Sequence, residues 1–277
     1  MMEPTEPPDD RGPATFTPST PLDRVVATLR AAGCVFAEDE ARLVLDAALD
    51  DEELAGMVDA RVAGRPLEQI LGWAEFCGLR IIVEPGVFVP RRRTEFLVHR
   101  AAALLSAEES VVVDLCCGSG AVAAALASTS TSTSTSIVVH ASDIDPVAAH
   151  CAARNIPSGS VHCGDLFDAL PPTLRGRVDV LVVNAPYVPS DAIGTMPPEA
   201  RLHEPRTALD GGADGVDVHR RVAAGAPDWL APGGHLLIET SEQQAGLTAD
   251  ACEQAGLDAC SIHDPDLGAT VVVARCR

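Results

Sequence analysis

The chain contains no lysine. All 20 of its basic residues are arginines, and against 40 acidic residues they leave a formal net charge of −20. A surface this acidic repels phosphate backbones, and no basic stripe offsets the repulsion. We therefore expect the partner to be a protein or a small molecule rather than a nucleic acid.

The sequence also lacks the patterns of several other protein classes. No segment approaches the ~18 consecutive apolar residues of a membrane span. The proline-rich, acidic N-terminus has no signal-peptide pattern. The nine cysteines form no Cys-x-x-Cys pair, and the eight histidines show no metal-ligand spacing. We expect free thiols in a reducing cytoplasm, no membrane contact and no bound metal ion.

The first part of the chain divides into a tail and a helical region. Residues 1–21 hold six prolines among acids and threonines, which predicts a disordered tail. Residues 22–77 place apolar side chains at helical spacing, which predicts a small all-α domain. Asp50 begins a run of four acids where the third helix should start, and this charge favours a helix N-terminus.

A hairpin is expected between the two domains, over residues 78–90. Two apolar triplets, Ile81–Val83 and Val87–Val89, flank the turn Glu84-Pro85-Gly86. Thr94 is the expected N-cap of a helix that follows over residues 95–105.

Residues 91–277 alternate strands with helices. The expected strands cover residues 111–115, 137–141, 161–163, 178–183, 235–239 and 271–274. The last strand follows a hairpin-like turn near residue 267, and a strict Ser/Thr alternation over 128–136 predicts a solvated loop. This pattern predicts an α/β fold with a seven-stranded, mostly parallel sheet covered by helices on both faces.

One stretch carries the strongest ligand-binding pattern. The apolar run Val111–Val113 ends at Asp114, and Gly118 and Gly120 precede an alanine-rich helix. Glycines let a backbone approach a ligand closely, and ligands bind open α/β sheets at the carboxyl ends of the strands. Only one Gly-x-Gly is present, which favours S-adenosylmethionine (SAM) over a dinucleotide. The alternative is an ordinary strand–turn–helix with glycines for packing.

Three further strand ends carry polar residues. Asp143 follows the second strand, where a carboxylate would hold a ribose diol, while Asp145 is placed to cap the helix that begins at Pro146. Asp165 follows the third strand and Asn184 follows the fourth. Together with the glycine loop, these residues predict one nucleoside pocket.

The segment Asn184-Ala185-Pro186-Tyr187 suits a planar NH₂ group as substrate. The Asn184 side-chain oxygen and the Ala185 carbonyl would accept its two N–H bonds, and the Tyr187 ring would pack on its plane. Pro186 restricts the backbone of Ala185. The alternative is an Asn-initiated turn with a packing tyrosine.

Five segments of this chain resemble the protein-(glutamine-N5) methyltransferases of the release-factor (HemK/PrmC) family. The segments are Arg65–Gly72, Phe88–Glu95, Asp114–Gly120, Asn184–Tyr187 and Glu204–Gly215. The last of these, with its Glu-Pro-Arg-x-Ala-Leu-Asp-Gly-Gly order, is the most specific to the family. The resemblance extends from about Gly64 to Arg275.

The resemblance implies an N-terminal helical domain that docks a protein substrate, and a class I SAM-dependent methyltransferase domain, in a protein expected to be a monomer. Asp143 would hold the ribose, Asp165 the adenine amine and Asn184 the glutamine amide. The implied cofactor contacts are Asp114, Cys116, Gly118, Gly120, Asp143, Ile144, Asp165, Leu166 and Asn184. The implied substrate contacts are Phe88, Arg91, Tyr187, Glu204 and Arg206, and the implied catalytic residues are Asn184, Ala185, Pro186 and Tyr187.

The sequence departs from the family pattern at three places. Ala185 replaces the first proline of the Asn-Pro-Pro-Tyr motif, Arg92 and Arg93 replace a Pro-Glu pair, and the tail has no counterpart. Two alternative functions remain. One is methylation of an exocyclic amine on a nucleic acid base, against which the charge and the Glu-Pro-Arg stretch argue. The other is SAM binding without turnover, which only Ala185 favours.

Overall fold

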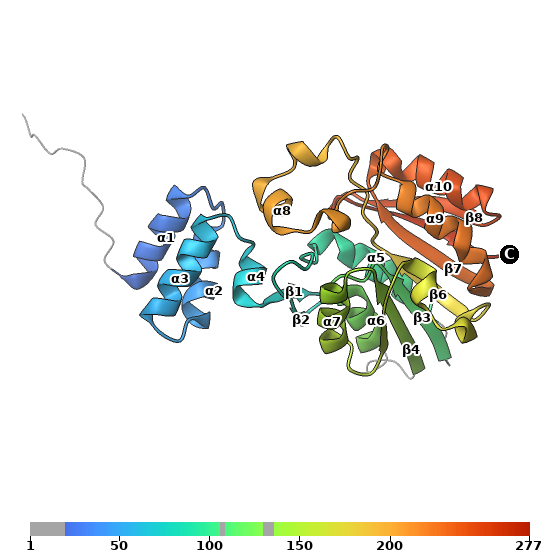
Figure 1. Cartoon of the computed structure of the whole chain (residues 1–277), viewed down its shortest axis with the longest axis horizontal. Helices are drawn as coiled ribbons and strands as arrows, with labels where there is room; N and C mark the ends of the chain where they lie inside the picture. The colour runs from blue at the N-terminus through green and yellow to red at the C-terminus, as the bar shows by residue number, and fades with distance from the viewer. Residues whose placement is uncertain (1–19, 106–108, 130–135) are drawn as a thin grey trace, which may run out of the picture. The chain divides into compact units, whose positions relative to one another are not determined.

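The computed structural model describes residues 20–105, 109–129 and 136–277 (Figure 1). Contacts divide the chain into two compact units, Met1–Ala63 and Gly64–Arg277, whereas the sequence placed the domain boundary at 77/78. The expected tail lies outside the described residues up to residue 19, and Pro21 already belongs to the first helix. Residues 130–135 of the Ser/Thr run also lie outside them.

Within residues 20–63, the described part of the first unit, there are three helices: α1 (Pro21–Ala31), α2 (Ala37–Ala47) and α3 (Asp51–Val62). Thr20 and Asp23 form a capping box at the start of α1, with N–H to oxygen distances of 3.0 and 3.1 Å. At the start of α3, Asp50 accepts the Glu53 N–H over 2.8 Å, so the acidic run caps a helix as predicted.

The second unit opens with α4 (Leu67–Leu71) and a hairpin of β1 (Trp73–Phe76) and β2 (Leu79–Ile82). The sequence predicted this hairpin over residues 78–90, whereas the structure forms it over residues 73–82. The expected turn exists, since Val87 N–H bonds to Glu84 O over 3.1 Å, but Val87–Val89 forms no strand. Side chains satisfy its backbone instead: Gln69 Nε2 donates to Val87 O, and Glu204 accepts the Val89 N–H.

A seven-stranded sheet forms the centre of this unit, in the order β5-β4-β3-β6-β7-β9-β8. Its strands are β3 (Glu109–Leu115), β4 (Ser136–Asp143), β5 (Ser160–Cys163), β6 (Val178–Val183), β7 (Leu230–Thr240), β8 (Asp258–Asp264) and β9 (Ala269–Arg275). The first five are parallel, and β9 is antiparallel to both β7 and β8. The predicted mostly parallel sheet with a terminal hairpin is confirmed.

Helices cover both faces of the sheet (Figure 1). One face of the sheet, which includes Val112, is covered by α5 (Glu95–Ala102), α6 (Ala121–Thr129) and α7 (Pro146–Asn155). The other face, which includes Val113, is covered by α9 (Asp217–Gly225) and α10 (Ala245–Gln254). A short helix, α8 (Pro198–His203), lies between β6 and α9. The 3₁₀ turns are Arg92–Thr94, Leu166–Ala169, Pro172–Leu174, Ile193–Thr195, Arg206–Ala208, Ala226–Asp228 and Glu242–Gln244.

The strand order places a ligand crevice beside β3. The chain moves outward from β3 to β4 and β5, and then returns to place β6 on the opposite side of β3. At such a switch point the connections leave in opposite directions and open a crevice at the carboxyl ends of the strands. Among the described residues, every helix is too short or too polar to span a membrane.

Candidate active site

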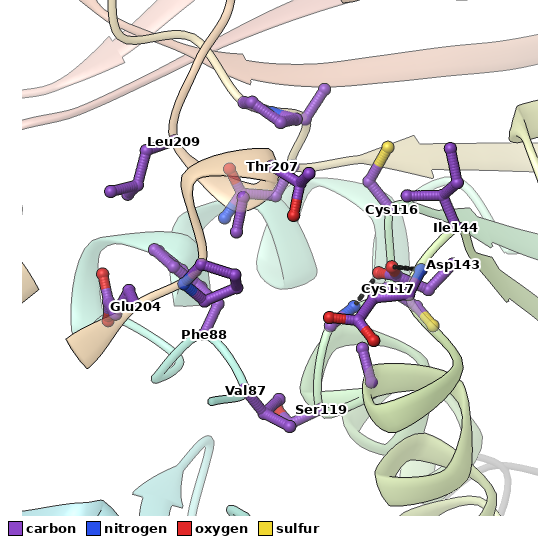
Figure 2. A pocket seen from close by; sticks show the side chains of 18 of the residues that line it. Val87, Phe88, Cys116, Cys117, Ser119, Asp143, Ile144, Glu204, Thr207 and Leu209 are labelled. Atoms are coloured by element: carbon purple, nitrogen blue, oxygen red, sulfur yellow. Dashed lines mark hydrogen bonds between the residues drawn. The ribbon is translucent and has the colours of Figure 1, made fainter. Parts of the chain in front are cut away.

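A cavity of about 530 Å³ opens at the carboxyl ends of the parallel strands (Figure 2). The segments that follow β3, β4, β5 and β6 line it, as do residues near Phe88 and residues 204–210. Figure 2 shows Asp143 and Ile144 beside the two cysteines of the glycine loop, with Phe88 and Glu204 across the cavity. Every site residue named from the sequence lines this cavity except Gly120.

The two glycines of the loop after β3 have different roles. Gly118 has φ 55°, and no heavy atom lies within 4 Å of where its Cβ would be, so its backbone is open to a ligand. Gly120 has φ 76°, but a Cβ there would lie 2.9 Å from the Ala152 side chain. Gly120 therefore serves helix packing between α6 and α7, as in the alternative interpretation, and it is not among the residues that line the cavity.

Two carboxyl groups hold the loop in shape. Asp143 accepts the Gly118 N–H over 2.8 Å with one oxygen and the Asp145 N–H over 2.9 Å with the other. Asp114 is buried and accepts the Ala123 N–H at the start of α6 over 3.1 Å. Burial raises the pKa of Asp114 to about 8. Burial also raises the pKa of Asp143, and the N–H groups of Asp145 and Gly118 oppose that rise.

The loop after β4 confirms the predicted helix cap. Asp145 accepts the Val147 N–H over 2.8 Å at the start of α7, which leaves Asp143 as the strand-end carboxylate that faces the cavity. Ile144, beside it, is 59% exposed and offers an apolar surface at the cavity wall.

This half of the cavity fits SAM by the chemistry of its groups. Carboxylates accept hydrogen bonds from a ribose diol and attract a cation, and an apolar side chain packs on an adenine ring. The wall supplies Asp143 and Asp165 as carboxylates, together with the buried carboxyl group of Asp114, the side chain of Ile144 and the open backbone of Gly118. Asp165 is partly engaged already, because Arg221 donates to one of its oxygens over 2.7 Å.

The other half of the cavity contains the Asn184–Tyr187 segment, which follows β6. Asn184 Nδ2 donates to the Thr94 hydroxyl over 3.3 Å, so the amide oxygen is the end left for a ligand. The prediction that Thr94 caps α5 is wrong, since its side chain makes no cap hydrogen bond. Its hydroxyl is buried next to Asn184 instead.

Tyr187 is held at both its hydroxyl and its backbone. Arg93 Nη2 donates to the hydroxyl over 2.7 Å, and Glu239 lies 3.5 Å beyond it as acceptor. Burial, followed by the charge of Glu239, raises the pKa of Tyr187 to about 12. The Tyr187 backbone oxygen accepts from Gln244 Nε2 over 2.8 Å, and the ring lies 6.4 Å from that of His219.

Two of the residues expected to bind the protein substrate, Arg91 and Glu204, pair with each other. Arg91 forms an ion pair with the buried Glu204, whose carboxylate also accepts the Val89 N–H over 3.3 Å. Burial raises the pKa of Glu204, and the Arg91 charge opposes the rise. Arg206 pairs with Asp210 over 2.9 Å. The Arg91–Glu204 pair joins the segment around Phe88 to residues 204–210, and the Arg206–Asp210 pair lies within the second of these two parts of the cavity wall.

Three residues near the Asn184–Tyr187 segment were missed as site residues: Arg93, Glu239 and Gln244. Glu239 had a usable signal, because it is an acid at the carboxyl end of an apolar strand, as Asp114 and Asp143 are. In the sequence, Arg93 stands out only as a departure from the family motif. Gln244 had no signal, since an isolated glutamine before a helix is common.

The comparisons with known proteins agree with this geometry. The model of the Methyltransferase small domain matches residues 78–214. A release factor glutamine methyltransferase of Geobacter sulfurreducens is 36% identical over 225 residues, covering 80% of this chain and 78% of the relative. One from Mycolicibacterium smegmatis is 35% identical over 266 residues, covering 88% and 92%. A solved methyltransferase from Pyrococcus furiosus shares the fold, with a TM-score of 0.53 at 16% identity over 80% of this chain and 98% of that one.

The sheet order, the cavity at its switch point and these matches define a class I SAM-dependent methyltransferase with SAM as its cofactor. Within that class, the chain belongs to the release factor glutamine methyltransferase family. The resemblance inferred from the sequence motifs is confirmed.

Proposed function

We propose that this enzyme transfers a methyl group to the side-chain amide nitrogen of a glutamine in a peptide-chain release factor. Bound SAM supplies an electrophilic methyl group on a sulfonium whose leaving group departs neutral. The orientation of the Asn184 side chain is the main support for this proposal. Its nitrogen donates a hydrogen bond to the Thr94 hydroxyl, so its oxygen remains to accept a hydrogen bond from the substrate.

The reaction needs the acceptor amide to be held, because its nitrogen lone pair is delocalised into the carbonyl group. Asn184 Oδ1 and the Ala185 carbonyl each accept one N–H of the glutamine amide, and the Tyr187 ring packs on its plane. Two acceptors on the hydrogens localise the lone pair on nitrogen and fix its direction of attack. No strong base is required before attack, because the methylated nitrogen is cationic and loses one proton to water after the sulfonium leaving group has departed.

On the cofactor side, we assign the ribose to Asp143, the adenine amine to Asp165 and the adenine face to Ile144. Gly118 keeps its backbone open, and Cys116 and Leu166 complete the wall beside it. Ala185 retains a backbone carbonyl in place of the family's proline, and Pro186 still restricts it, so turnover is retained.

The acceptor is a protein rather than a nucleic acid in this proposal, and the enzyme acts as a cytoplasmic monomer. The net charge of −20 disfavours nucleic acid, and the buried free thiols Cys117, Cys151 and Cys252 suit a reducing compartment. The helical unit takes part in docking, and its exposed apolar side chains Phe36 and Leu49 supply the contact.

Methyl-labelled SAM separates the alternatives in one assay. A cell lysate, a purified release factor and total RNA and DNA are each incubated with the enzyme, and label is counted in protein and in nucleic acid. Label in the release factor supports the proposal. Label in nucleic acid would favour base methylation, and SAM binding without any transferred label would favour a protein without turnover.

A further inference from the structure

One buried carboxyl group, that of Glu239, lies next to the Asn184–Tyr187 segment and does not line the cavity. Glu239 is near the carboxyl end of β7, and its side chain is 2% exposed. One of its oxygens, Oε1, lies 3.4 Å from Arg93 Nε and 3.5 Å from the Tyr187 hydroxyl. Its other oxygen has no hydrogen-bond partner among the described residues. A buried carboxyl oxygen that lacks a hydrogen bond costs free energy, so the presence of Glu239 at this position needs an explanation.

The first contact of Glu239 reaches the tyrosine. Arg93 donates to the Tyr187 hydroxyl over 2.7 Å, its guanidinium lies 6.0 Å from the ring centre, and its Nε faces Glu239. The hydroxyl therefore accepts from Arg93 and donates toward Glu239. This arrangement fixes the tilt of the ring that faces the cavity.

The second contact reaches the asparagine. Thr94 is buried, and its hydroxyl accepts the Asn184 Nδ2–H bond. Burial raises the pKa of Glu239, and the nearby Thr94 hydroxyl opposes that rise. A hydroxyl that accepts from Asn184 has its own proton available, and we assign the unpartnered Glu239 oxygen as its acceptor, which fixes which end of the Asn184 amide faces away.

We propose that Glu239 is a positioning residue for methyl transfer, which orients Asn184 through Thr94 and Tyr187 through Arg93. Glu239 itself does not touch the acceptor, since its side chain is buried behind these residues and does not line the cavity. Arg93 replaces an acid of the family motif, and here it supplies the cation that faces Glu239. This inference rests on the proposed function, because it assigns the two side chains that hold the acceptor amide.

The main test is Glu239→Gln, with Glu242→Gln as the matched control on the exposed turn just after β7. We expect Glu239→Gln to lower kcat on the order of tenfold to a hundredfold, the scale of a misplaced reacting group. SAM affinity should change by less than about twofold, since none of the cofactor contacts is removed. The control should retain the wild-type kcat.

A second readout needs no substrate. Tyr187 is the only tyrosine in the chain, so the absorbance of its phenolate titrates one group. Glu239 raises the pKa of Tyr187 and Arg93 lowers it. Glu239→Gln should therefore lower the pKa of Tyr187. If the wild type methylates no release factor but the titration shifts this way, the proposed function fails while the contact between Glu239 and Tyr187 stands.

Variants at Thr94 test whether the contact with Asn184 acts through the Thr94 hydroxyl or only through packing. Thr94→Val keeps the shape and removes the hydroxyl, whereas Thr94→Ser keeps the hydroxyl. We expect the valine variant to lose kcat as Glu239→Gln does, and the serine variant to stay within about threefold of wild type. A wild-type kcat or an unshifted tyrosine titration in Glu239→Gln would overturn the inference. Loss of SAM affinity and melting temperature in parallel with kcat would overturn it too, because it would mark a merely structural role.

Discussion

A Cβ atom on Gly215 would lie 2.4 Å from the backbone oxygen of Tyr187 and 2.1 Å from Gln244 Nε2. Gly215 also has φ 79°, a conformation that side chains rarely adopt. The family-specific glycine stretch thus packs directly behind the Asn184–Tyr187 segment, and Gln244 links the two by donating to Tyr187 O and Asp214 O.

Gly215→Ala should therefore lower both stability and turnover. The strained conformation costs about 1–3 kcal/mol, and the forced shift of Tyr187 should add a loss of kcat. The matched control is Gly268→Ala, at φ 58° with nothing within 4 Å of its Cβ, which should cost stability alone. Thermal melting and steady-state kinetics on both variants test this. Equal kcat values in the two variants would contradict the packing role.

His219 should make the protein less stable in acid. Its ring is buried against Tyr187 and bonded to Thr248 over 2.9 Å, and burial lowers its pKa from 6.5 to about 4. Below the unfolded pKa, the unfolded chain takes up a proton that the folded chain excludes. As pH falls from 6.5 to about 4, the free energy of unfolding therefore drops by up to about 3 kcal/mol. Urea unfolding of the wild type and His219→Gln across this pH range measures the difference, and identical pH profiles would rule it out.

Asp114 should act in the opposite direction. Burial raises its pKa from 3.8 to about 8, so the folded carboxyl keeps a proton that the unfolded one has lost. Its contribution to stability is present below the unfolded pKa and is lost as pH rises toward the folded pKa. As pH rises from about 5 to about 7, we expect the free energy of unfolding of Asp114→Asn to rise by more than about 1 kcal/mol relative to that of wild type. The variant retains an oxygen to accept the Ala123 N–H. A constant difference across this range, measured by urea unfolding without SAM, would show that Asp114 is ionised throughout.

The helical unit is tested by polar substitution of its exposed apolar side chains. Phe36 is 69% exposed and Leu49 is 90% exposed, so Phe36→Ser and Leu49→Ser should not disturb the core. Serine at position 36 also places a favoured N-cap residue before α2. If this surface docks the release factor, KM for the protein substrate should rise about tenfold for the pair, with kcat and SAM affinity unchanged. An unchanged KM would remove these residues from docking.

Much of the fold could be predicted because the central strands β3, β6 and β7 are largely buried apolar runs that end in or beside a polar residue. Asp143, Asp165 and Asn184 were found as strand ends, and the parallel sheet brings strand ends together. Glu239 follows the same rule but lies behind the cavity, so its place depended on three-dimensional packing.

The differences from the sequence predictions have local physical causes. Gly118 and Gly120 look alike in sequence, and only the helix that packs on Gly120 distinguishes them. Thr94 suits a helix cap, but the fold gives its hydroxyl a partner, Asn184, that follows a strand far along the chain. The apolar segment Val87–Val89 follows a real turn, yet its backbone bonds to Gln69 and Glu204 rather than to a strand.

The central claim is that Asn184 holds a glutamine amide of a release factor for methylation. The most direct test incubates wild type and Asn184→Ala with SAM and a purified release factor, and maps the modified residue by mass spectrometry. We predict one methyl group on a glutamine side-chain nitrogen with the wild type. With Asn184→Ala, turnover should fall roughly a hundredfold or more while SAM affinity is retained. An unmodified release factor, a methyl group on another residue type, or normal turnover in Asn184→Ala would contradict the account.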